Sequence, residues 1–487
     1  MSRLFSRSQD HPKTDACREY RVLCGIEEEF LLINKNGSLV QKADDVMLSA
    51  ARILQQDTRR LRELRLRIRA LDPEPSQAQI EYTTLPSPPT STQDFVTEGR
   101  KLVSDASRAA NCLALCQSIH PYESRPHPLA GIHINVSVRK GERLMTPNEQ
   151  LAVYNHCWNH LPELIAISAN SPVIAGNPTG IASNRNAQSR VLRRNPFGTL
   201  QIPQKQSQLV QQSYYGRLRY SLKIGSDDTE PLVIMNPEGN RFTDISARGP
   251  YTNIDQDRDE TPLRNRVEIR IFDVQTSSAR LVDLCHLCCG LALNSMSYLQ
   301  DNIDIEPDPY HDENVDRAIR NGLEATLLGP NGRIKARERV RELSIELTPY
   351  LDLMGVRFHT SLPSGKPEIS QSSTPILTRK MQVFDELHSE GRFYVMIEKG
   401  RKSTATDPRT GQKYQIPQGS RLFGTLQARH HMKLDEGEHG MISSFKEADP
   451  AYYLVVRGIP VLLDQEDKIE VAMTKNEYNR RRFFGFF

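Results

Sequence analysis

The sequence lacks any long hydrophobic run and any strong excess of charge of one sign. Its 487 residues include 63 basic and 60 acidic side chains, so the formal net charge is only +3 at neutral pH. A membrane-spanning helix needs roughly 20 consecutive apolar residues, and no segment approaches that length. The near balance of charge gives no chain-wide attraction to nucleic acid or to a membrane surface. We therefore expect neither as a partner.

The sequence also lacks a secretory signal and a recognisable zinc motif. Residues 1–15 are predominantly polar, with no apolar segment of the kind that directs export. The eight cysteines form no paired CxxC pattern. Three of them, Cys285, Cys288 and Cys289, lie in an apolar stretch over residues 281–299 that predicts a buried helix, and packing is favoured over metal ligation there. Together these features predict a cytoplasmic protein with reduced thiols.

A change of pattern near residue 392 divides the chain. Residues 1–16 predict a loose leader, and residues 17–391 predict a large α+β domain of mixed strands and helices. Residues 392–487 contain short β-like runs separated by turns, which predicts a smaller β-rich domain. Within the large domain, apolar residues at helical spacing predict one helix over residues 44–70. Its arginine-rich end could contact phosphate or RNA, but a solvated face is favoured.

Four predicted strands carry ionisable side chains on one face, which is unusual for strands that only fill a core. They span residues 21–34, 77–85, 131–138 and 264–274. Side chains two positions apart in a strand point to the same side of the sheet. The groups that share a face are Glu27 with Glu29, Gln79 with Glu81, His133 with Asn135, and Arg266 with Glu268 and Arg270. Glu28 points the other way.

Taken together, these strands predict a cage of carboxylates with one imidazole. Its members are Glu27, Glu29, Glu81, His133 and Glu268. Such an oxygen-rich set suits Mg²⁺ or Mn²⁺ better than structural zinc. The carboxylates would repel one another unless cations neutralised them, and divalent cations bound with a triphosphate meet that need. Arg266 and Arg270 could then clamp phosphate oxygens.

Short motifs in these strands resemble, in order, the metal- and nucleotide-binding strands of the type 2 glutamate–cysteine ligase family, also called the carboxylate–amine ligases. The motifs are Gly25-Ile26-Glu27-Glu28-Glu29, Gln79-Ile80-Glu81, Gly131-Ile132-His133-Ile134-Asn135 and Arg266-Val267-Glu268-Ile269-Arg270. The run from Ser168 to Arg185 resembles the substrate-side loop of the same family. The resemblance spans about residues 21–391, most of the chain.

The resemblance implies a glutamine-synthetase-like fold, in which an antiparallel sheet flanked by helices forms a funnel. ATP would enter at one end and the acid substrate at the other, and the cage residues would be the metal ligands. The implied catalytic centre is Arg270 facing the transferred phosphoryl group, with Glu81 and Glu268; the implied nucleotide side is Arg266, Arg270 and Asn135. Many relatives have a second histidine at the position of Asn135.

The implied substrate side is led by Arg185, which would hold a carboxylate, with Ser183 and Arg190 as further candidates. The implied reaction is ATP-dependent formation of an amide from a glutamate-like acid and an amine, through an acyl phosphate. Small-molecule substrates and a homo-oligomer follow from the same resemblance. The stretch over residues 201–261 and the added domain depart from the family pattern, so the identity of both substrates stays open.

Two alternatives follow from the added domain and from the nucleotide site. In the first, residues 392–487 recruit a protein or peptide, and the chain is a macromolecule-modifying amide ligase. In the second, the chain binds a nucleotide but has lost catalysis. The complete set of predicted metal ligands makes the second alternative the weaker one.

Overall fold

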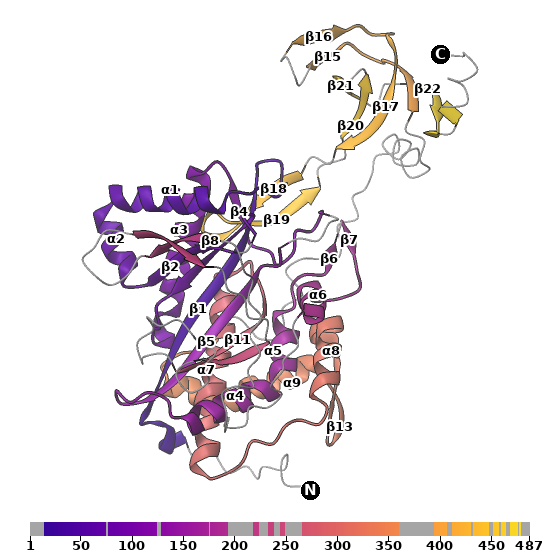
Figure 1. Cartoon of the computed structure of the whole chain (residues 1–487). Helices are drawn as coiled ribbons and strands as arrows, with labels where there is room; N and C mark the ends of the chain where they lie inside the picture. Colours follow the sequence, from indigo (N-terminus) through magenta and orange to yellow (C-terminus); the bar gives the residue numbers. More distant parts are fainter. Residues whose placement is uncertain are drawn as a thin grey trace. The chain divides into compact units, whose positions relative to one another are not determined.

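The chain forms two units, which we describe separately (Figure 1). The first comprises Met1–Gln371 with Glu436–Ser444, and the second comprises Ser372–Asp435 with Phe445–Phe487. The computed structural model describes residues 14–74, 76–123, 128–174, 176–192, 218–223, 232–237, 244–248, 265–359, 394–406, 412–429, 432–447, 451–456, 459–463, 468–475 and 477–478. The predicted leader and the boundary predicted between residues 391 and 392 lie largely or wholly outside these ranges.

An antiparallel sheet forms the centre of the first unit, with the strand order β10-β11-β5-β1-β3-β2-β8-β9. The strands are β1 Tyr20–Ile33, β2 Ile68–Pro73, β3 Gln79–Thr84, β5 Gly131–Lys140, β8 Leu218–Lys223, β9 Leu232–Pro237, β10 Ile245–Arg248 and β11 Arg266–Asp273. The long strand β1 lies between β5 and β3 (Figure 1). The four predicted strands correspond to β1, β3, β5 and β11, all near the middle of the sheet.

Smaller strands and the helices complete the first unit. The strands are β4 Leu113–Leu115, β6 Val173–Ile174, β7 Asn177–Pro178, β12 Thr326–Gly329 and β13 Gly332–Lys335. The helices are α1 Ala43–Gln56, α2 Thr58–Arg65, α3 Thr92–Ala109, α4 Pro147–Asn159, α5 Leu161–Ser168, α6 Asn184–Leu192, α7 Ser278–Gln300, α8 His311–Asn321 and α9 Ala336–Leu353. In the part of the chain that is described, no helix is both long and apolar enough to cross a membrane.

The sheet has one apolar face and one face rich in ionisable groups. Alternate residues of β1, β5 and β11, such as Ile26, Ile134 and Ile269, are buried in the main hydrophobic core. Helices α3 and α7 pack against the central strands, and α7 is the predicted buried helix, with all three of its cysteines inside. The unit is therefore an α+β structure with a multi-stranded sheet, whereas closure of that sheet into a funnel stays a prediction.

The prediction of one helix over residues 44–70 is wrong. Helix α1 ends at Gln56, and the side chain of Asp57 accepts a hydrogen bond from the N–H of Arg60 at 2.9 Å, which caps the start of α2. The chain then becomes strand β2, which pairs with β3 and places Asp72 opposite Glu81. Pairing along β3 overrides the helical spacing of the apolar residues, and it adds an acidic strand to the sheet.

A buried ion pair fixes the centre of the sheet to α3. Glu28 points away from its neighbours on β1 and is fully buried. Its carboxylate accepts hydrogen bonds from Arg100 Nη2 at 2.7 Å and Nε at 3.1 Å, and from the Tyr82 hydroxyl at 2.8 Å. Three donors satisfy most of the carboxylate's acceptor capacity, which is what a buried charge requires.

The second unit is built from strands around a small core. Its five-stranded antiparallel sheet has the order β21-β20-β17-β14-β22, and a separate hairpin pairs β15 with β16. The bounds are β14 Tyr394–Glu398, β15 Ser403–Thr406, β16 Lys413–Ile416, β17 Arg421–Arg429, β20 Ala451–Val456, β21 Ile459–Leu462 and β22 Lys468–Met473. Between β17 and β20 run β18 Met432–Glu436 and β19 Ile442–Glu447, and the segment Glu436–Ser444 that joins them belongs to the first unit.

We predict that Arg100→Leu lowers the free energy of unfolding of the first unit by about 3–5 kcal/mol, because it leaves the Glu28 carboxylate buried without its counter-charge. The matched control is Arg108→Leu on the same helix. Arg108 pairs with Glu436 at 2.6 Å, but the two side chains are 42% and 58% exposed, so the loss should stay below about 1 kcal/mol. Denaturant unfolding followed by circular dichroism measures both, and equal losses would contradict the role given to Arg100.

Candidate active site

Strand pairing brings the predicted cage residues together on the face of the sheet opposite Glu28. Glu29 pairs with Glu81 across β1 and β3, and Glu27 pairs with His133 across β1 and β5. Glu268 on β11 lies opposite Asn135 on β5. Because directly paired residues of an antiparallel sheet have neighbouring side chains, the register alone makes these groups adjacent.

The cage consists of two overlapping clusters that share one imidazole. In the first, Glu27, His133 and Glu268 offer ligand atoms within 4.8 Å of one another, and in the second Glu29, Glu81 and His133 do the same. The Nδ1 atom of His133 lies 3.0 Å from Glu27 Oε2 and 3.7 Å from Glu268 Oε1, and its Nε2 lies 3.4 Å from Glu29 Oε1. All five predicted ligands are thus gathered, and their binding of metal stays a prediction.

The electrostatics of the cage fit divalent cations. Burial, followed by repulsion from Glu74, raises the pKa of Glu29 to about 8. Burial and repulsion from Glu74 and other acids raise the pKa of Glu81 well above its ordinary value. Burial and the nearby Arg270 charge lower the pKa of His133 to about 4, so the imidazole is neutral and keeps a lone pair. Mutually repelling oxygens beside a neutral imidazole form a donor set suited to Mg²⁺ or Mn²⁺.

The two predicted phosphate-side arginines border the first cluster. Arg270 donates to Glu268 Oε1 at 2.5 Å, and Arg266 Nε donates to the side-chain oxygen of Asn135 at 2.8 Å. Asn135 in turn donates from Nδ2 to Glu27 Oε1 at 3.2 Å. Glu268 therefore lies between two arginines along β11, and the side chain of Asn135 links Arg266 to Glu27.

Arg185 lies buried next to the backbone of Arg270. Its side chain is only 1% exposed, and its Nη2 donates to the backbone oxygen of Arg270 at 3.1 Å. Among the described residues, its Nε and Nη1 have no hydrogen-bond partner. Buried polar atoms are nearly always hydrogen-bonded, and the planar guanidinium edge matches a carboxylate in particular. Arg185 therefore has donors suited to a carboxylate, and its binding of the acid substrate stays a prediction.

A glycine makes room for this arginine. A Cβ atom at Gly131 would lie 1.9 Å from Arg185 Nη2, closer than any atom can approach. The N–H of Gly131 also donates to Glu29 Oε2 at 2.7 Å, so the start of β5 contacts both the cage and the arginine. Sequence reasoning noted this glycine only as part of a motif, because the approach of a residue 54 positions away is not visible in a strand pattern.

The other two predicted substrate residues have different surroundings. The hydroxyl of Ser183 is buried and donates to Asp273 Oδ1 at 2.9 Å, so its direct contact with a substrate stays a prediction. Arg190 belongs to α6, but its side chain lies outside the described residues. Most of residues 201–261, which depart from the family pattern, also lies outside them.

Two acidic residues near the cage were missed by sequence reasoning. Asp72 lies on β2 opposite Glu81, and Glu74 follows directly after the strand. Both raise the pKa of Glu81. Asp72 and Glu74 are two positions apart, as Glu27 and Glu29 are. They were missed because the residues just before them, up to residue 70, were predicted to be a helix.

We predict that the affinity for Mn²⁺ rises with pH through the pKa of Glu29, at about 8. Below the pKa of Glu29, a cation must displace its proton, so tighter binding is expected at pH 8.5 than at pH 6.5 by up to about tenfold per pH unit for each proton released. Calorimetric titration of the full chain at several pH values measures this. Glu29→Gln should bind more weakly with a shallower pH dependence, and a pH-independent affinity in the unaltered protein would contradict the assignment.

Comparison with known proteins finds a family model that matches part of the chain. Residues 125–349 match the model of glutamate-cysteine ligase family 2 (GCS2). This range contains β5, α6 and β11, and so includes His133, Arg185 and Glu268, whereas the acids of β1 and β3 precede it.

The chain is also similar to individual proteins. A protein from Rubrobacter xylanophilus, provisionally named glutamate–cysteine ligase 2-3, is 25% identical over 381 residues, which are 72% of this chain and 89% of that protein. One from Saccharopolyspora erythraea, provisionally named glutamate–cysteine ligase 2-2, is 29% identical over 211 residues, or 37% and 50% of the two chains. A Francisella tularensis glutamate–cysteine ligase crystallised with AMP is 13% identical, with coverage of 69% and 80% and a TM-score of 0.41. The chain is therefore similar to glutamate–cysteine ligase family 2, and the family and sequence matches support an ATP-dependent ligase.

Proposed function

We propose that this chain is an ATP- and Mg²⁺-dependent ligase that joins a glutamate-like acid to an amine through an acyl phosphate. The observation that carries the proposal is the position of Arg185. Its buried guanidinium has two nitrogen atoms without a hydrogen-bond partner in the described part of the chain. It also contacts the backbone of Arg270, whose side chain contacts the cage at Glu268. A carboxylate-binding group therefore lies beside a site suited to cations and phosphate.

Different residues of the chain would bind the acid, stabilise the transferred phosphoryl group and position the nucleotide side. Arg185 orients the acid, and a substrate with two carboxylates can be held by one while the other reacts, which favours a dicarboxylic amino acid such as glutamate. Arg270 offers permanent positive charge where charge spreads over the transferred phosphoryl oxygens. Mg²⁺, when bound by the cage, would neutralise the phosphates of ATP. Asn135 keeps Arg266 in place at the nucleotide side.

The reaction then proceeds in two balanced steps. An oxygen of the free carboxylate attacks the γ-phosphorus of ATP, the bond from that phosphorus to the ADP oxygen breaks, and ADP leaves. The amine nitrogen next attacks the acyl carbon, the carbon–oxygen bond to phosphate breaks, and inorganic phosphate leaves as the nitrogen loses a proton. Neither step requires a nucleophile from the protein, because positioning and charge neutralisation supply the catalysis.

We predict that the full chain releases ADP only when an acid and an amine are both present. A panel of amino acids, with glutamate as the first acid and cysteine as the first amine, followed by mass spectrometry of the product, tests this and identifies the substrates. Glu29→Gln and Glu268→Gln should lower the rate at least about 100-fold, because each removes a charge that would hold a cation. Full activity in either variant would contradict the proposed metal site.

We predict that Arg185→Lys raises the KM for the acid by about 10- to 100-fold, because an ammonium cannot reproduce the two-pronged contact of a guanidinium. The KM for ATP should change little. Arg317→Lys is a matched control, since Arg317 only pairs with Glu313 on the surface of α8 and bonds to a nearby backbone oxygen. An Arg185→Lys enzyme with an unchanged KM for the acid would show that the carboxylate binds elsewhere.

A further inference from the structure

The segment Glu436–Ser444 returns from the C-terminal part of the chain into the first unit. Its turn contains two residues with positive φ, His439 at 57° and Gly440 at 76°, which reverse the chain between β18 and β19. The N–H of Cys116 donates to the backbone oxygen of Ile442 at 2.8 Å, beside the pairing of β19 with β4. The segment is therefore hydrogen-bonded into the first unit as a structural part of it.

Glu438, in this turn, caps the longest helix of the first unit. Its Oε2 accepts a hydrogen bond from the N–H of Ser278 at 2.8 Å, across 160 residues of sequence. Ser278 is the first residue of α7, and the side chain of the preceding Ser277 makes no capping bond. The first N–H groups of a helix lack partners within it, and a carboxylate there is favoured by the helix dipole. Glu438 supplies the cap that the local sequence does not.

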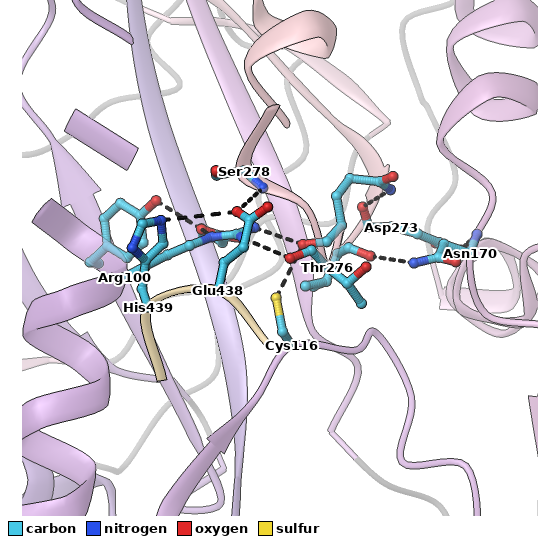
Figure 2. Close-up of polar contacts among 12 residues, drawn as sticks. Arg100, Cys116, Asn170, Asp273, Thr276, Ser278, Glu438 and His439 are labelled. Atoms are coloured by element: carbon cyan, nitrogen blue, oxygen red, sulfur yellow. Dashed lines mark hydrogen bonds and ion pairs between the residues drawn. The ribbon is translucent and has the colours of Figure 1, made fainter. Parts of the chain in front are cut away.

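The residues just before α7 are held from a second direction by Arg100. Its Nη1 donates to the backbone oxygen of Thr276 at 3.1 Å, and its Nη2 donates to that of Gln275 at 2.7 Å. Figure 2 shows Arg100 bonded to Thr276 and, close by, Ser278 bonded to Glu438. The connection between β11 and α7 is thus fixed by one buried arginine and one carboxylate from the returning segment.

The segment between β11 and α7 is hydrogen-bonded to the residues that hold Arg185. The side chain of Gln275 donates to the backbone oxygen of Asp273 at 2.8 Å. The buried carboxylate of Asp273 accepts bonds from the N–H of Asn170 and the hydroxyl of Ser171, each at 2.7 Å. The Ser171 oxygen accepts the N–H of Arg185 at 3.1 Å. Asp273 therefore anchors the loop that leads into α6, and Arg185 reaches the site from the start of that helix.

We propose that Glu438 is a positioning residue of the acid-substrate site. Glu438 holds residues 275–278. These residues in turn keep Asp273 in the position where Asn170 and Ser171, in the loop before Arg185, bond to it. The proposal rests on the proposed function, in which Arg185 binds the acid. It also assigns part of the substrate site's rigidity to a segment beyond residue 349, where the family match ends.

Three variants of the full chain test this. Glu438→Ala removes the cap, Glu438→Gln retains an acceptor oxygen, and Glu436→Ala is the control, because Glu436 lies in the same segment but contacts the exposed side chain of Arg108. Hydrogen exchange measured by mass spectrometry follows residues 168–186 and 273–280 without requiring activity. Steady-state kinetics gives the KM values for the acid and for ATP.

For Glu438→Ala we expect about threefold to tenfold faster exchange in residues 168–186 and a similar rise in the KM for the acid, with the KM for ATP unchanged. Glu438→Gln should recover most of both effects, and Glu436→Ala should show neither. Unchanged exchange in residues 168–186, or equal effects of Glu436→Ala, would overturn the proposal. If the unaltered protein shows no acid- and amine-dependent ADP release, the proposed function fails, and the exchange measurement alone decides whether Glu438 positions the loop.

Discussion

The buried pair of Arg100 and Glu28 is the interaction on which the rest of the first unit depends. Glu28 lies between Glu27 and Glu29 on β1, so its fixed position sets which way both neighbours point. Arg100 uses its remaining donors on the backbone between β11 and α7. One guanidinium therefore joins the strand that carries two cage acids to the strand end that supports Arg185, and it does so from the face of the sheet opposite the site.

The chemistry of the site follows from a local excess of negative charge. Glu29 and Glu81 are buried among other acids, and both have raised pKa values for that reason. Repulsion of this kind costs stability unless a cation is bound, which is typical of functional sites rather than of structural cores. Arg185 has the complementary property, a buried positive charge with two nitrogen atoms that no described residue hydrogen-bonds. The two together favour a reaction between a carboxylate and a cation-bound phosphate.

The sequence predicted which side chains gather in the cage, but it did not predict strand β2 or the contacts that support the cage. Alternation in a strand fixes which side chains share a face, so Glu27, Glu29, Glu81, His133 and Glu268 could be grouped from their spacing alone. Strand β2 was missed because its pairing with β3 is a tertiary effect. Contacts such as Glu438 with Ser278 join residues 160 positions apart and leave no local pattern. Because Glu438 belongs to the first unit, a deletion after Gly391 would remove the cap of α7 as well as most of the second unit.

The most direct test of the central claim is the fate of a carboxylate oxygen. The full chain is supplied with ATP, Mg²⁺, an amine and an acid labelled with ¹⁸O in its reacting carboxylate, and the released phosphate is examined by mass spectrometry. We expect one ¹⁸O atom in each phosphate, because the acid oxygen that attacks the γ-phosphorus leaves with it. Unlabelled phosphate alongside a labelled amide product, or ADP release with no amide formed, would contradict it.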